Sequence, residues 1–207
     1  MKTRDSSATR LKLLDAARDV IRAQGYSATT VDDICASAGV TKGSFFHHFA
    51  SKEEMGIAAI EQFGVMADGV FATAPYRSLP DPLDRVLGYV DFRASMMQGD
   101  VALYSCLLGT SVQEAYATHP DIRAACEQGM TGHIEQLMLP DIEAAKQKYV
   151  PDAQWSAESV GYHIQSVLQG SFIYAKVKQS PAVALDNMAH LKRYLQMLFN
   201  PAKEQAK

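Results

Sequence analysis

The sequence is poor in cysteine and has no long apolar segment, and both absences narrow the class of protein. Its three cysteines lie far apart and lack the spacing of a metal site, so free thiols and no bound metal are expected. No apolar run approaches the roughly 18 residues of a membrane span, and the polar N-terminus predicts no secretory signal. We therefore expect a cytoplasmic protein with no cofactor and no membrane partner.

Signals for β-structure and for common catalytic sites are also missing. The sequence shows no sustained alternation of apolar and polar residues and no Asn-Gly or Asp-Gly hairpin turn. It has no Gly-rich phosphate loop, no Gly-x-Ser-x-Gly elbow and no cluster of metal ligands. His133 and His163 stand alone on helical segments, which is more typical of core or surface residues than of catalytic ones. The prediction is an all-α protein that is not an enzyme; turnover by its C-terminal region would revive the enzyme alternative.

What the sequence has throughout is helical periodicity interrupted by proline and glycine. In the first helical segment Leu11, Leu14, Ala17 and Ile21 recur at spacings of three and four, which predicts one buried face, and Gly25 supplies a left-handed stop. The pattern predicts about nine helices, at residues 7–24, 31–38, 42–49, 52–72, 82–98, 101–117, 120–148 with a break near Pro140, 154–178 and 181–199.

Capping residues mark the short helices near the N-terminus. Thr30 is a good N-cap with an acidic residue three positions later, which imitates a capping box, and Gly39 ends that helix. Thr41 can cap the next helix, and Ser51 with Glu54 forms the Ser-x-x-Glu pattern that opens the fourth. Two short helices joined by a tight turn are the plan of a helix-turn-helix motif.

The charges are distributed unevenly along the chain. Residues 1–52 hold eight Lys and Arg against five Asp, a balance of +3, whereas the remaining 155 residues hold twelve bases against eighteen acids, a balance of −6. A basic segment at one end of an acidic body suits an anionic partner. We therefore expect a helix-turn-helix DNA-binding domain at 1–52, fused to a larger helical domain at 53–207.

The stretch "VTKGSFFHHF", residues 40–49, contains the expected recognition helix. The N-terminal part of such a helix enters the DNA major groove. Gly43 costs about 1 kcal/mol relative to alanine inside a helix, which is reasonable if the backbone must approach a partner closely. Lys42 and Ser44 flank it and can reach base edges or phosphates, while Phe45 and Phe49, four apart, are expected to pack on the first two helices.

Two adjacent histidines, His47 and His48, admit three interpretations. A shared metal ion is disfavoured because neighbouring residues on a helix point about 100° apart and no further ligand lies at suitable spacing. Both can be ordinary surface or packing residues. They can also donate hydrogen bonds to DNA phosphates near the helix N-terminus.

Residues 9–56 resemble the DNA-binding domain of TetR-family transcriptional regulators. The resemblance lies in the Gly-Tyr after the first helix, the Thr-Thr-Val that opens the second, and the segments "AGV", "KGSFFHHF" and "SKEE". It implies an all-helical homodimer that represses a palindromic double-stranded DNA operator and releases it when a small-molecule effector binds. Phe46 departs from the family, which often has a tyrosine there whose hydroxyl can donate to phosphate. The positions that the resemblance assigns to DNA contact are Thr30, Thr41, Lys42, Gly43, Ser44, Phe46, His47, His48 and Lys52.

The C-terminal region is expected to supply dimerisation and effector binding. The resemblance assigns the dimer interface to the last two helices, at 154–178 and 181–199, although their periodicity also fits an intramolecular core. Large side chains on the middle helices suit either a pocket for a flat apolar molecule or an ordinary core. The predicted effector-pocket residues of this kind are Phe92, Met96, Tyr104, Trp155, Tyr162 and Phe172.

Cys106 and Lys176 complete the predicted effector residues. The segment "YSCLLGT" and the later lysine resemble a TetR subgroup in which some members respond to electrophiles or oxidants. A nearby lysine would stabilise the thiolate, the form that attacks electrophiles. The alternative is that Cys106 is an inert packing residue. A third functional class, a protein-interaction module with a vestigial helix-turn-helix, is disfavoured by the intact polar residues of the motif.

Overall fold

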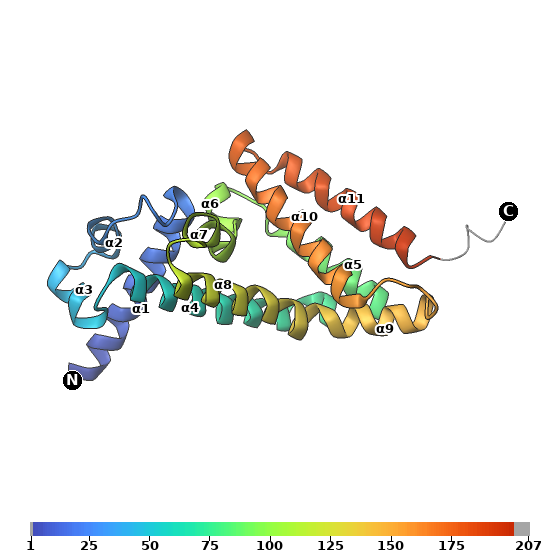
Figure 1. Cartoon of the computed structure of the whole chain (residues 1–207), viewed down its shortest axis with the longest axis horizontal. Helices are drawn as coiled ribbons and strands as arrows, with labels where there is room; N and C mark the ends of the chain where they lie inside the picture. Colours follow the sequence, from blue (N-terminus) through green and yellow to red (C-terminus); the bar gives the residue numbers. More distant parts are fainter. Residues whose placement is uncertain (1, 201–207) are drawn as a thin grey trace. The chain divides into compact units, whose positions relative to one another are not determined.

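A computed structural model describes residues 2–200 (Figure 1), with side chains from residue 6 onward. All regular elements in this part of the chain are helices, so the predicted all-α class is confirmed. The elements are α1 (Lys2–Gln24), α2 (Val31–Ala38), α3 (Lys42–His48), α4 (Lys52–Ala72), η1 (Pro75–Ser78), α5 (Pro82–Ser95), α6 (Val101–Tyr104), α7 (Leu107–Ala115), α8 (Pro120–His133), η2 (Ile134–Met138), α9 (Leu139–Tyr149), α10 (Ala157–Lys178) and α11 (Ala182–Leu198).

The helix ends near the N-terminus follow the predicted capping residues. Thr30 caps α2 through a capping box, and Gly39 ends α2 in the left-handed conformation with φ +67°. Thr41 caps α3 by accepting a hydrogen bond from the Ser44 N–H at 3.2 Å. At the start of α4 the predicted Ser51 cap is present, since its hydroxyl accepts from the Glu54 N–H at 3.1 Å, whereas the Glu54 carboxylate returns a bond to the Ala50 N–H at 2.6 Å instead of to Ser51.

Two of the long predicted segments are divided in the structure, one unexpectedly and one at the break predicted near Pro140. The segment 101–117 splits into α6 and α7, because Cys106 adopts an extended conformation and caps α7. The segment 120–148 splits into α8, a single π-helical turn η2, and α9, with Pro140 in the first turn of α9. A proline has no N–H for the preceding turn, so the regular hydrogen-bond ladder is interrupted there and a π-turn takes its place.

The first compact unit comprises residues 1–67 and 105–130. Its core is formed by apolar faces of α1, α2, α3 and α7 and the adjoining parts of α4 and α8. The predicted face of α1 needs one correction: Leu11 is 50% exposed, whereas Leu13 and Leu14 are buried. Successive helical positions rotate by about 100°, and the buried stripe runs from Leu13 and Leu14 through Ile21, which leaves Leu11 beside it.

The second compact unit comprises residues 68–104 and 131–207, of which the structure describes those up to 200. Within it α10 packs along α11, and α5 packs against both α9 and α11. The two units divide the chain differently from the functional division expected at residue 52, because α7 and most of α8 share a core with α1–α3. A functional boundary at residue 52 stays a prediction.

One helix also passes a simple test for a membrane span. On length and composition alone, α4 is apolar enough to cross a bilayer, contrary to the expectation from apolar runs. Core helices of globular proteins pass the same test, and Met55, Ala59 and Ile60 of α4 are buried in the first unit.

Candidate nucleic-acid interface

The start of α2 is held by a local network around Thr30. The Thr30 hydroxyl accepts a hydrogen bond from the Asp33 N–H at 3.1 Å and donates to the Asp33 carboxylate at 2.7 Å. The Thr30 N–H donates to the same carboxylate at 2.9 Å. These bonds to Thr30 lower the pKa of Asp33. The Thr30 hydroxyl, which was predicted to contact phosphate, therefore already serves as the cap of α2.

Two buried phenylalanines fix α3 against the first unit. Phe45 is fully buried and Phe49 is 2% exposed, as their spacing predicted, and their rings lie 5.8 Å apart. The Arg10 guanidinium covers the Phe49 ring at 5.1 Å. Because the inner face of α3 is held in this way, its other face is left at the surface.

The outward face of α3 carries the predicted DNA-contacting residues. Thr41, Lys42, Gly43 and His47 are exposed, and Ser44 is half-buried. Phe46 is 54% exposed, which is unusual for a phenylalanine, whereas its neighbour Phe45 is fully buried. The structure therefore leaves this part of the predicted set accessible along α3, the second helix of a helix-turn-helix.

Nothing in the described part of the chain requires glycine at position 43. It is absent from the positive-φ residues there, and a methyl group on it would meet one atom within 4 Å, the Thr41 Oγ1 at 3.8 Å. Alanine would fit and would favour the helix by about 1 kcal/mol. The glycine therefore suits a helix whose backbone is approached from outside the protein.

Lys42 is engaged by an acidic neighbour from α2. Its ammonium lies 2.8 Å from the Asp32 carboxylate, and both side chains are more than half exposed. Hydrogen bonding to Asp32 raises the pKa of Lys42, so it stays charged. A phosphate or base that takes this ammonium has to displace Asp32.

His47 and His48 end α3 as a pair of surface rings. Their centroids lie 5.0 Å apart in an edge-on arrangement. Burial lowers the pKa of His48, and the neighbouring His47 and Arg10 act in the same direction. Among the described residues, no group of three His, Cys, Asp or Glu side chains is placed to hold a metal ion.

Lys52 points toward the loop between α1 and α2. Its ammonium donates to the carbonyl oxygens of Tyr26 at 3.0 Å and Thr29 at 2.9 Å, and lies 4.4 Å from the centre of the Tyr26 ring. Burial lowers its pKa, partly offset by Glu114. In this arrangement Lys52 stabilises the loop that precedes α2, whereas the resemblance assigned it to phosphate.

The same loop receives a carboxylate from α7. Glu114 accepts a hydrogen bond from the Ser27 N–H at 2.7 Å. Gly25 has φ +92°, and a methyl group on it would come within 2.2 Å of the Glu114 Oε1. Glycine is therefore required at this position twice, by the backbone conformation and by the close approach of Glu114.

The predicted effector residues of the second unit do not form one cluster. Tyr104 and Phe172 lie together, with ring centroids 6.3 Å apart, and the Tyr104 hydroxyl is buried without a hydrogen-bond partner among the described residues. Phe92 packs on Phe71 at 5.4 Å. Met96 is 40% exposed.

The remaining effector candidates are more dispersed. The Trp155 ring packs on Phe199 at 5.2 Å and borders an open groove of about 1150 Å³. Tyr162 is 45% exposed on α10, and Lys176 lies in the last turn of the same helix. Cys106 belongs to the first unit, where its Sγ accepts a hydrogen bond from the Gly109 N–H at 3.4 Å.

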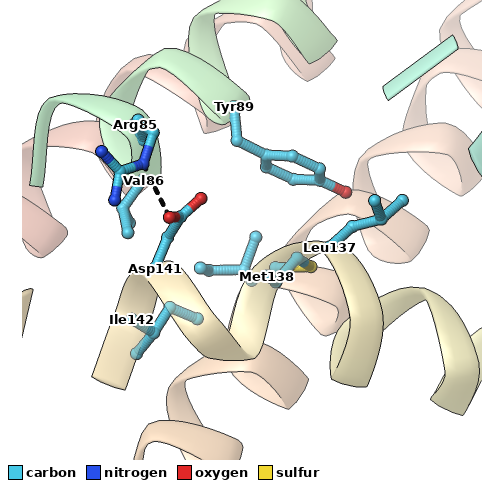
Figure 2. Close-up of a pocket in the computed structure, with 8 residues that line it drawn as sticks. Arg85, Val86, Tyr89, Leu137, Met138, Asp141 and Ile142 are labelled. Carbon is cyan, nitrogen blue, oxygen red and sulfur yellow. Dashed lines mark hydrogen bonds and ion pairs between the residues drawn. The ribbon is translucent and has the colours of Figure 1, made fainter. Parts of the chain in front are cut away.

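A small cavity lies elsewhere in the second unit. It measures about 10 Å³, room for about one water molecule. Figure 2 shows Tyr89 from α5 and Met138 from η2 bordering it, with the Arg85–Asp141 ion pair, 2.7 Å long, on one side. The lining residues are Arg85, Val86, Tyr89, Leu137, Met138, Asp141, Ile142 and Ile164, none of which is among the predicted effector residues.

Beside this cavity lies a buried polar cluster that sequence reasoning missed. It joins Asp68, Tyr89, His133 and Gln165 by hydrogen bonds. His133 was interpreted as an isolated histidine, and its burial agrees with a core position. A single His, Tyr or Gln on a helix carries no pairing signal, because the four partners come from distant parts of the chain.

These features define a helix-turn-helix protein with an outward recognition helix. Residues 13–59 match the family model for "Bacterial regulatory proteins, tetR family". This segment of the chain is therefore similar to the DNA-binding region of TetR-family transcriptional regulators, as its motifs predicted.

Three relatives illustrate the similarity. The transcriptional regulator AcuR of Cereibacter sphaeroides is 33% identical over 125 residues, which cover 58% of this chain and 55% of AcuR. The repressor KstR2 of Mycobacterium tuberculosis is 41% identical over 86 residues, 40% of either chain. The reduced form of NemR from Escherichia coli shares the fold with a TM-score of 0.77, at 22% identity over 90% of this chain and 96% of that one. The match thus spans about half of AcuR and two-fifths of KstR2.

Proposed function

We propose that this protein is a homodimeric repressor that binds a palindromic DNA operator through α3 and releases it when a small-molecule effector binds the C-terminal region. The observation that carries the proposal is the outer face of α3, where Lys42, Gly43 and Phe46 are exposed while Phe45 and Phe49 anchor the helix. An unhindered glycine beside a lysine suits close approach to a DNA backbone.

Dimerisation through α10 and α11 is the second part of the proposal. A two-fold dimer would present two recognition helices to half-sites about one helical turn apart, which the palindrome requires. Both helices expose large apolar side chains in the single chain, which favours burial against a second copy. These residues are Tyr162, Ile173, Tyr174, Val177, Leu185, Tyr194 and Met197.

Salt-dependent operator binding tests the DNA interface. The DNA is a palindromic fragment from upstream of the protein's own gene, and affinity is measured from about 50 to 200 mM salt. Each lost lysine–phosphate contact reduces the log–log slope by about 0.9, so Lys42→Ala should reduce it by about 2 in a dimer. Lys148→Ala, which removes a lysine of α9 that pairs with Asp81, serves as the charge control. A slope and affinity unaffected by Lys42→Ala would refute this interface.

The Asp32–Lys42 ion pair allows a second test in the opposite direction. Asp32→Asn removes the carboxylate that competes with DNA for the Lys42 ammonium, and it also removes a negative charge from the interface. Operator affinity should therefore rise more when Asp32→Asn is made in the wild type than when it is made in Lys42→Ala, where only the lost repulsion contributes. An equal gain in both backgrounds would show that Lys42 is not the group released.

An electrophile or oxidant sensor acting through Cys106 is the second candidate. Cys106 sits at the N-cap of α7 and is half-buried, with its Sγ accepting the Gly109 N–H. Burial lowers the pKa of the Arg22 guanidinium, whereas Asp19 and Cys106 act in the opposite direction, so a cation also lies within electrostatic range of the thiol. The similarity to NemR is compatible with this candidate.

A quinone provides the test of this candidate. The Cys106 sulfur would add to a ring carbon of benzoquinone: an S–C bond forms, the C=C π bond breaks, the quinone oxygens take up the thiol proton and the proton lost from that ring carbon, and the product is a hydroquinone thioether. Operator affinity should fall in the wild type and stay constant in Cys106→Ser. An equal loss in both proteins would remove Cys106 as the trigger.

A further inference from the structure

A polar cluster lies inside the second unit, where four helical elements meet. Tyr89 is 3% exposed, His133 7% and Gln165 8%, so three polar side chains are more than nine-tenths buried. They come from α5, the end of α8 and α10, and Asp68 joins them from the end of α4. Burying polar groups is unfavourable unless their hydrogen bonds are satisfied, so the arrangement of those bonds is informative.

The Tyr89 hydroxyl is the centre of this network. It accepts hydrogen bonds from the Gln165 amide at 2.9 Å and from the Arg93 Nε–H at 3.1 Å. It lies 3.0 Å from His133 Nε2, and His133 Nδ1 lies 2.7 Å from the Asp68 carboxylate. These bonds assign a neutral imidazole that donates from Nδ1 to Asp68 and accepts the Tyr89 proton at Nε2. Burial, then the Arg93 charge, lowers the pKa of His133 to about 4, which agrees with this assignment.

Arg93 brings a positive charge to the cluster without forming a direct ion pair among the described residues. Its guanidinium lies 4.1 Å from the centre of the Phe71 ring, and its Nε–H is used by Tyr89. In the described part of the chain no carboxylate oxygen lies within 4 Å of it, and its two terminal nitrogens make no hydrogen bond there. Arg77 and Arg85 of the same unit differ, because both pair with Asp141. A half-buried arginine with two unused donors is suited to a planar anion.

Apolar surfaces adjoin both Arg93 and Tyr89. The Arg93 guanidinium lies over the Phe71 ring, which packs edge-on against Phe92 with centroids 5.4 Å apart. Tyr89 also borders the small cavity that Met138 lines (Figure 2). Met138 is a flexible side chain on the π-turn η2, and the Gln165 amide contacts its sulfur at 3.4 Å. A change of Met138 rotamer would enlarge the cavity next to the polar cluster.

We propose that Arg93, together with Tyr89 and Gln165, forms the head-group site of the effector, and that the effector is an organic anion with one carboxylate or sulfonate on a flat apolar body. The proposal rests on the proposed function, since it specifies the ligand class of the regulator. The anion takes the terminal N–H groups of Arg93, and its apolar body lies against Phe71 and the widened cavity. Binding thereby alters the contacts that join α5, α8 and α10 at Tyr89.

Benzenesulfonate is the probe, because it stays anionic at every pH used, and benzenesulfonamide is its neutral counterpart of similar shape. Calorimetry at pH 7.5 should show at least about tenfold tighter binding of the sulfonate to the wild type. Arg93→Met keeps most of the side-chain volume without the charge and should lose at least about tenfold in affinity for the sulfonate. Arg93→Lys should retain part of it, and Arg123→Met, which removes an exposed arginine of the first unit, should behave as the wild type.

A second readout separates a ligand site from a merely structural cluster. Sulfonate binding cancels the Arg93 charge, which is one cause of the low pKa of His133, so the imidazole NMR signals of His133 should titrate at higher pH with the probe present. The charged groups that face this ring are Asp68 and Arg93, and Tyr89 is its other titratable neighbour. Thermal melts check that each variant is folded.

Several results would overturn the proposal. Equal affinities for the sulfonate and the sulfonamide, or unchanged sulfonate binding in folded Arg93→Met, would show that Arg93 does not hold an anion. Probe binding that leaves operator affinity unchanged would remove the effector role of the site. Failure to bind operator DNA without any probe would instead refute the proposed function, so the two failures are distinguishable.

Discussion

Acidification should destabilise the second unit through His133. The imidazole is neutral and buried, and its pKa is about 4, compared with 6.5 for a free histidine. His133 is therefore protonated below pH 6.5 in the unfolded chain, whereas in the folded protein it is protonated only below about pH 4. Stability is at its full value above pH 6.5 and is lost as the pH falls through this window. At about 1.4 kcal/mol per pH unit, the loss amounts to about 3 kcal/mol.

The assay uses the single tryptophan of the chain. Trp155 lies in the second unit with His133, so its fluorescence during urea denaturation reports on that unit. Free energies of unfolding are measured between pH 7 and 4 for the wild type and for His133→Gln. The carboxylates titrate in both proteins, so their contribution cancels in the difference. The wild type should lose about 3 kcal/mol more than the variant over this range. The same pH dependence in both proteins would refute the neutral, buried state of His133.

Three further predictions concern the first unit, each measured as a free energy of unfolding. Thr30→Ala removes the α2 cap and should cost about 1 kcal/mol, most of which Thr30→Ser should restore. Gly25→Ala should cost more than Gly39→Ala: both residues have positive φ and pay about 1–2 kcal/mol for a side chain, but only the methyl on residue 25 strikes a carboxylate at 2.2 Å. Phe45→Ala empties a fully buried site and should cost about 3–5 kcal/mol, whereas the exposed Phe46→Ala should stay within about 0.5 kcal/mol and act on DNA affinity instead. Equal costs for Gly25→Ala and Gly39→Ala would contradict the backbone assignment, and equal costs for Phe45→Ala and Phe46→Ala would contradict the burial assignment.

Local chemistry explains why most helix ends could be predicted. Thr30, Gly39 and Thr41 act within four residues of themselves, so the bounds of α2 and α3 follow from the chain alone. The alternation of buried and exposed residues on α3 also follows from its period, including Phe45 inside and Phe46 outside.

What could not be predicted depends on contacts between distant residues. The division at Cys106 interrupts an apolar pattern that would otherwise continue as helix, whereas the break near Pro140 followed from the proline itself. The orientation of Lys52 toward the loop, and that of Glu114 toward Ser27, arise from residues 23 to 87 positions apart. The same holds for the Tyr89 cluster, whose members become hydrogen-bond partners only when α5, α8 and α10 pack together.

The packing of Glu114 against the loop before α2 limits how the recognition helix can be transplanted. A fragment that ends at residue 52 would lose the α7 carboxylate that holds the Ser27 N–H, together with the apolar cover supplied by Leu107, Leu108 and Ile122. Chimeras that exchange operator specificity between relatives would therefore need to carry residues 105–130 along with the N-terminal helices. A junction placed directly after α3 would pack α1–α3 of one protein against the α7 and α8 segment of another, whose side chains are matched to different N-terminal helices.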